Sequence, residues 1–119
     1  MKLAPFNKKI IWAIALFIST SHIYAGEKLN LDNPLDRICA IIGATAFSAA
    51  KGRDKGVKIE KVKIEIRRFL SRYRSQDIMR HGMEAVDFAY GYGSSMPPKE
   101  LAKWVTFEWC LNYVDITKP

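Results

Sequence analysis

The chain has 119 residues, 49% of them hydrophobic, and its 19 basic and 12 acidic residues leave a net charge of +7 at pH 7. This length indicates a single domain, and no repeat or low-complexity tract interrupts it. The two cysteines, Cys39 and Cys110, do not form a CxxC redox pair, and without clustered histidines they cannot complete a tetrahedral zinc site.

The first 25 residues have the pattern of a cleavable signal peptide. Basic residues come first (Lys2, Lys8 and Lys9), an apolar run covers residues 10–18, and a small, polar stretch ends at Ala25. The nine residues of the apolar run are about half of the roughly 20 that a membrane-spanning helix needs. This favours cleavage after Ala25 over a membrane anchor, and it predicts a periplasmic or secreted protein.

Removing 25 of the 119 residues leaves 94, which is near the small end for a self-sufficient core. Export places Cys39 and Cys110 where disulfides persist, and two cysteines allow one connectivity. A bridge between them closes a loop of 71 residues and would stabilise the fold by about 4 kcal/mol in the chain-entropy model. Two free, buried thiols are the alternative.

The first helix is predicted to begin at Pro34, with Asn33 as its N-cap, and to end near Gly52 to Gly56. The next segment is ambiguous, because β-branched residues within 57–66 also suit a strand. Apolar residues continue at helical spacing beyond it, and they favour a helix over residues 58–73. These residues are Ile59, Val62, Ile66, Phe69 and Tyr73.

Ser75 is predicted to cap a third helix, which Gly91 and Gly93 end. A loop follows, and Pro98 opens a last helix that runs to about Val114 and carries Cys110. The predicted fold is therefore all-α: a small four-helix bundle over residues 26–119, with one disulfide joining the first and last helices.

The last helix has two apolar strips if each residue advances about 100°. Trp104 and Cys110 fall on the core side, whereas Val105 and Trp109 lie beyond a polar line. The second strip is either a wide core or an exposed patch that meets a partner. Together with the tyrosine-glycine loop, it supplies the candidate partner-binding residues Tyr90, Tyr92, Val105 and Trp109.

Basic residues are concentrated between Lys51 and Arg74, where ten Lys or Arg stand against three acids. The interpretation is either a solvated helix face or a surface that binds anions. The candidate anion-binding residues are Lys63, Arg67, Arg68, Arg72 and Arg74. Export argues against nucleic acid as the ligand and leaves anionic lipid or glycolipid of the envelope.

Catalytic, metal and cofactor motifs are not found in the sequence, so we expect no enzyme and no cofactor. The only mature histidine is His81, with no nucleophile placed beside it. Glu108 lies among apolar residues and could be a buried carboxylate, but pairing with an arginine or contact with water is the favoured interpretation. A partner for a carboxylate pair is missing.

The layout of this chain resembles that of two groups of small periplasmic proteins. It combines a signal peptide, about 90 mature residues, helices only and one cysteine near each end of the helical region. The two groups are the acid-stress chaperones of the HdeA type and the helical immunity proteins that neutralise type VI secretion amidases. The resemblance is one of architecture, and it implies a non-enzymatic role in binding another protein.

The leading hypothesis is therefore an exported protein-binding module, acting as an inhibitor, an immunity protein or a chaperone on another periplasmic or envelope protein. The alternative is an envelope-associated protein that binds anionic lipid or glycolipid through its basic helix. A homodimer formed through the second apolar strip, Val105 and Trp109, is a further alternative.

Overall fold

The computed structural model describes residues 29–113, so the predicted signal peptide and the end of the last helix at Val114 lie outside the described residues. Helices make up the regular structure of this part of the chain. They are α3 (Pro34–Asp54), α4 (Ile59–Leu70) with the 3₁₀ turn η1 (Ser71–Tyr73), α5 (Gln76–Tyr90), and a last helix in three parts: α6 (Pro98–Lys103), η2 (Trp104–Cys110) and α7 (Leu111–Tyr113).

Helix α3 begins where the sequence predicted. The Asn33 side-chain oxygen accepts hydrogen bonds from the backbone N–H groups of Leu35 (2.9 Å) and Asp36 (3.2 Å), and Pro34 occupies the first helical position. These bonds satisfy donors that the first turn otherwise leaves without partners. The rest of α3 is rich in small buried residues, which let other helices approach it closely.

Residues 59–70 form helix α4 and not a strand, which resolves the ambiguity of the sequence. Val62, Ile66 and Leu70 recur every four residues and are fully buried. This spacing places one side chain above the next on a helix, whereas a strand would alternate them between two faces. Arg74, at a left-handed φ of 51°, then turns the chain towards α5.

Helix α5 packs closely against α4. Ser75 caps it as predicted, since its hydroxyl oxygen accepts the backbone N–H of Ile78 at 3.1 Å. Gly82 is buried where the helices meet, and a Cβ at this position would collide with the side chain of Leu70. The end of the Leu70 side chain thus fills the space that a side chain at position 82 would need.

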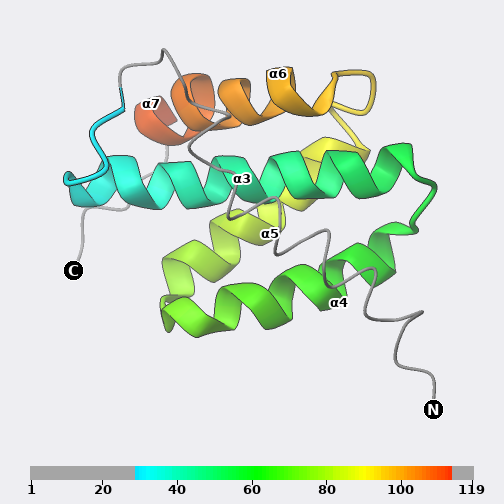
Figure 1. Cartoon of the computed structure of the whole chain (residues 1–119), viewed down its shortest axis with the longest axis horizontal. Coiled ribbons are helices and arrows are strands. Elements are labelled where there is room, and N and C mark those ends of the chain that lie inside the picture. Colours follow the sequence, from blue (N-terminus) through cyan, green and yellow to red (C-terminus); the bar gives the residue numbers. More distant parts are fainter. Residues whose placement is uncertain (1–28, 114–119) are drawn as a thin grey trace.

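The helices form the predicted bundle. Figure 1 shows α3 running through the middle, with α6 and η2 along one long edge and α4 along the opposite edge. Helix α5 packs against both α3 and α4. The Cys39–Cys110 disulfide joins the first described helix to the last. Within residues 29–113, no helix is both long enough and apolar enough to span a bilayer.

Candidate functional site

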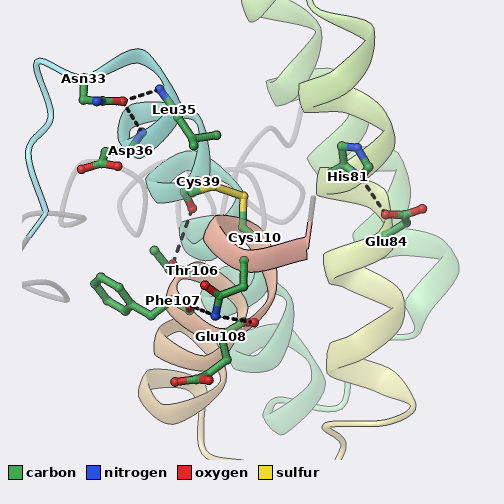
Figure 2. Close-up of a disulfide and its surroundings, with 11 residues drawn as sticks. Asn33, Leu35, Asp36, Cys39, His81, Glu84, Thr106, Phe107, Glu108 and Cys110 are labelled. Atoms are coloured by element: carbon green, nitrogen blue, oxygen red, sulfur yellow. Dashed lines mark hydrogen bonds and ion pairs between the residues drawn. A yellow bond between two sulfur atoms is a disulfide. The ribbon is translucent and has the colours of Figure 1, made fainter. Parts of the chain in front are cut away.

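The disulfide lies inside the bundle, where α3 meets the last helix (Figure 2). Cys39 and Cys110 are fully buried, and their Cα atoms are 5.6 Å apart. Beside them, the hydroxyl of Thr106 donates a long hydrogen bond of 3.5 Å to the carbonyl of Cys39. The disulfide thus fixes the last helix to α3 at Cys110, and it positions the residues before and after Cys110 relative to α3.

The last helix is not α-helical throughout, because η2 is a π-helix of seven residues. The backbone N–H of Leu111 donates to the carbonyl of Thr106, five residues earlier. The side-chain amide of Asn112 donates to the carbonyls of Phe107 (3.1 Å) and Glu108 (3.3 Å). The wider turns of a π-helix are rare in proteins, and those that occur are frequently at functional sites.

The π-helix changes which side chains share a face. In an α-helix, five positions leave Trp104 and Trp109 about 140° apart, so the sequence assigned them to different strips. In a helix bonded from i to i+5, positions five apart are nearly in line. Both indole rings accordingly reach Phe88 of α5, with ring centroids 5.5 Å and 4.9 Å away.

The same change corrects the prediction for Val105. Val105 lies five residues before Cys110, and both side chains are fully buried in the core. Of the two interpretations of the strip, the wide core is therefore right for Val105, and Val105 is wrong as a partner-binding candidate. A fixed rotation of about 100° per residue places it on a separate strip only because the helix widens midway.

Five rings from α5, the following loop and η2 form one connected group, which we call the aromatic cluster. Tyr92 contacts both Phe88 (6.4 Å between centroids) and Trp104 (5.5 Å). The ring of His81 meets Trp109 edge-on at 5.8 Å. Edge-to-face contacts of this kind add to the stability that burial provides. The members of the cluster are His81, Phe88, Tyr92, Trp104 and Trp109.

Exposure varies sharply across the aromatic cluster. Tyr92 is 76% exposed, whereas the other four rings are half-buried. Trp109, which the sequence offered as a contact residue, is thus half-buried, with its ring against Phe88 and His81. Tyr92 is the member with the most surface free for contact.

The loop that carries Tyr92 is held in place by Arg53 at the end of α3. The guanidinium donates to three carbonyls: Ala89 (2.9 Å), Gly93 (3.0 Å) and Met96 (2.8 Å). Its side chain is only 14% exposed, and it also pairs with Asp54 at 2.9 Å. Arg53 therefore closes the end of α5 and fixes the loop after it. Sequence patterns do not indicate this role of Arg53, because each carbonyl is at least 36 positions away along the chain.

Tyr90 has a structural role that the sequence did not assign. Its hydroxyl donates a 2.5 Å hydrogen bond to the carbonyl of Val57, which ties α5 to the turn between α3 and α4. Desolvation raises the pKa of Tyr90 above 10.0; the charge of Arg53 opposes the rise, and those of Asp54 and Glu60 add to it. With its hydroxyl occupied and its ring half-buried, Tyr90 is a weaker contact candidate than Tyr92.

His81 and Glu108 do not form a joint site. The imidazole Nδ1 of His81 hydrogen-bonds to Glu84, one turn along α5, at 2.8 Å. Glu108 is exposed on η2, and Figure 2 shows it well separated from the His81–Glu84 pair. Of the two alternatives for Glu108, the buried carboxylate is thus wrong, and contact with water is right. Within residues 29–113, no group of three or more His, Cys, Asp or Glu is arranged to hold a metal ion.

The basic residues divide into one paired lysine and an exposed remainder. Lys63 is half-buried and pairs with Asp87 of α5 at 2.9 Å, so the structure gives it an internal partner. The guanidinium of Arg72 lies 5.4 Å from the centre of the Phe69 ring. The other candidates, Arg67, Arg68 and Arg74, are exposed on or just after α4.

Comparisons with protein-family models, with curated proteins and with solved structures found no match to this chain.

Proposed function

We propose that this chain is an exported, non-enzymatic protein-binding module that contacts a periplasmic or envelope protein through Tyr92 and the aromatic cluster. Inhibition, immunity or chaperoning would each use such a surface. The signal-peptide pattern of residues 1–25 supports export, and so does the disulfide, since disulfides persist in oxidising compartments.

One observation carries the proposal: Tyr92 is 76% exposed and yet packed on Trp104 and Phe88. Tyrosine and tryptophan are enriched among the residues that dominate binding energy at protein interfaces. A tyrosine offers a large contact area with few rotatable bonds. The exposed ring here already has neighbours that limit its orientation.

Arg53 strengthens the proposal, because its three hydrogen bonds fix the backbone on both sides of the exposed tyrosine. Ordering a loop on binding costs free energy, and a loop that is ordered beforehand avoids that cost. The loop has two glycines and would otherwise be flexible. The arrangement suits a contact surface that is formed before the partner arrives.

The proposal is tested by quantitative capture with Tyr92→Ala. The chain is produced by export so that its disulfide stays intact, and it is then purified and immobilised. Envelope extract is passed over it, and the captured protein is quantified by mass spectrometry. We expect Tyr92→Ala to lower capture of the wild-type partner at least about tenfold, as loss of a central aromatic contact does. The melting temperature should fall by only about 4–8 °C, since the ring is mostly exposed and its contacts with Phe88 and Trp104 contribute about 1 kcal/mol.

The matched control is Tyr73→Ala, which removes another exposed tyrosine, 39% exposed and outside the aromatic cluster. It should leave capture unchanged. Equal capture by wild type and Tyr92→Ala would disprove the assigned surface.

Arg53→Lys tests the role of the ordered loop. Lysine keeps the charge, but it cannot donate to three carbonyls in the fixed planar geometry of a guanidinium. We expect weaker capture than with Arg37→Lys, which changes an exposed arginine of the same helix.

A further inference from the structure

A second surface, separate from the aromatic cluster, is strongly basic. Residues 58–74 contain seven basic and two acidic side chains, a net charge of +5. Lys63 pairs with Asp87, but none of the other six forms an ion pair within residues 29–113, and all six are exposed. The unpaired cations are Lys58, Lys61, Arg67, Arg68, Arg72 and Arg74.

The spacing of these residues on α4 aligns several of them. Lys61 and Arg68 are seven residues apart, so they lie along one line of α4, opposite the core residue Leu70, and Arg72 follows in the 3₁₀ turn η1. The acids are Glu60, which is exposed, and Glu65, which is half-buried and lies beside this line, four residues after Lys61 and three before Arg68. The outer face of α4 therefore presents cations in a row to the solvent.

An exposed aliphatic side chain lies within this row. Ile64 is 53% exposed, three residues after Lys61 and four before Arg68. No core role explains it, because α4 is buried through Val62, Ile66 and Leu70. Cations around an exposed apolar side chain are the combination that favours a lipid interface: charges meet phosphates, and the apolar group enters the headgroup region.

We propose that the outer face of α4 docks on the surface of a bilayer that contains anionic phospholipid. Lys61, Arg68 and their neighbours would meet lipid phosphates, and Ile64 would enter the headgroup layer. Nucleic acid fits less well, since single strands stack their bases on aromatic rings. Phe69 packs against the core and has Arg72 over its ring, and an isoleucine offers no stacking face. Tyr73, 39% exposed and edge-on to Phe69, is the one ring of residues 58–74 with surface left for stacking.

This inference goes beyond the proposed function, because it concerns another part of the molecule. Figure 1 places α4 on the long edge opposite α6 and η2, and η2 carries both tryptophans of the aromatic cluster. A molecule docked through α4 would keep that opposite edge turned away from the membrane, so lipid and protein could be bound together.

Co-sedimentation with lipid vesicles tests the inference. The chain, exported and purified with its disulfide intact, is mixed with phosphatidylethanolamine vesicles that contain about 30 mol% phosphatidylglycerol or none. We expect binding to the anionic vesicles alone, with a steep decrease between about 0.05 and 0.5 M salt. Each Lys or Arg near such a surface strengthens partitioning about fivefold, so Lys61→Gln/Arg68→Gln should weaken it about 25-fold.

Two further variants separate the contributions. Ile64→Asn should weaken binding several-fold at every salt concentration, because the apolar contact is not screened. Lys55→Gln/Lys99→Gln removes the same charge from exposed positions outside α4 and should weaken binding much less. All substituted side chains are exposed, so the melting temperatures should agree closely with that of the wild type.

The inference is overturned if sedimentation does not depend on phosphatidylglycerol or on salt, or if the two double variants weaken binding equally. Tighter binding to a single-stranded oligonucleotide than to the anionic vesicles would also overturn it, and it would assign the basic face to nucleic acid. Capture of a protein partner through Tyr92 is measured without lipid, so either proposal can fail while the other stands.

Discussion

At the scale of single residues, two polar side chains hold the loop after α5. Arg53 donates to the carbonyls of Ala89, Gly93 and Met96. Tyr90 anchors the end of α5 to Val57. Each of these bonds joins segments more than 30 positions apart in the chain. Local patterning, which identifies caps and apolar faces, has no means of indicating such partners.

Tyr90 gives a prediction about how the free energy of unfolding depends on pH. Its pKa is raised in the folded state, mainly by desolvation, so the fold favours the neutral phenol. This contribution to stability is complete below pH 10.0, the ordinary pKa, and is lost as the pH rises through the higher folded-state pKa. We therefore expect the free energy of unfolding to fall as the pH rises from 10.0 towards the folded-state pKa.

Tyr90→Phe checks the assignment by urea unfolding at neutral and at alkaline pH. The variant loses the bond to Val57 and should be less stable at neutral pH by about 0.5–1.5 kcal/mol. Its alkaline decrease should be smaller, with Tyr73, whose pKa burial also raises, supplying part of the remainder. Tyr92→Phe, at an exposed position, should lie within about 0.5 kcal/mol of the wild type. An unchanged alkaline decrease in Tyr90→Phe would contradict the assignment.

At the scale of elements, the π-helix η2 decides the composition of the aromatic cluster. Its sequence contains two apolar pairs five residues apart, Trp104 with Trp109 and Val105 with Cys110. The first pair meets Phe88 and the second is buried in the core. This repeat was visible in the sequence, and it is the signal that could have predicted the widened turn.

Deletion of Glu108 tests whether η2 is an α-helix that one additional residue has widened. Removing one residue from a turn bonded from i to i+5 leaves a turn bonded from i to i+4, so both pairs become aligned on an ordinary α-helix. Glu108 is exposed and contributes no side chain to the core. We expect the shortened chain to fold, to keep its disulfide by intact-mass analysis, and to retain cooperative thermal unfolding by circular dichroism.

The control is deletion of Ile64, an exposed residue in the middle of the regular helix α4. This deletion rotates one half of α4 by about 100° relative to the other and turns part of its apolar face to solvent. We expect it to abolish cooperative unfolding. Equal damage from the two deletions would mean that the π-helix is not a removable widening of an α-helix.

At the scale of the whole molecule, the core is small and depends on its crosslink. Many of the buried residues of α3 are alanine, glycine, serine or threonine, which bury little apolar area each. Chains of this size gain limited stability from burial alone. The disulfide restrains the unfolded chain over a separation of 71 residues and links helices that are far apart in the sequence.

Removal of the disulfide is the prediction at this scale. Cys39→Ser/Cys110→Ser should lower the free energy of unfolding by about 4 kcal/mol, as expected for a loop of this length. Because domains are stable by only about 5–15 kcal/mol, the variant should unfold at much lower urea concentration or fail to fold. Urea titration followed by circular dichroism measures the difference. A midpoint that matches the oxidised wild type would show that the crosslink is dispensable.

The sequence by itself determined the elements that rest on local chemistry. Asn33 and Ser75 cap their helices with their own side chains, and the spacing of Val62, Ile66 and Leu70 distinguishes a helix from a strand. Two cysteines allow a single intrachain pairing, so the link between the first and last helices was also within reach. The all-α bundle followed from these features.

The tertiary structure alone decided how the candidate site is arranged. Whether Val105 is buried, whether Trp104 and Trp109 share a face, and what Arg53 binds all depend on distant segments and on a helix that departs from 3.6 residues per turn. Periodicity describes one element with one fixed rotation per residue. Contacts between elements, and local changes in that rotation, arise only when the packed chain satisfies all its buried groups at once.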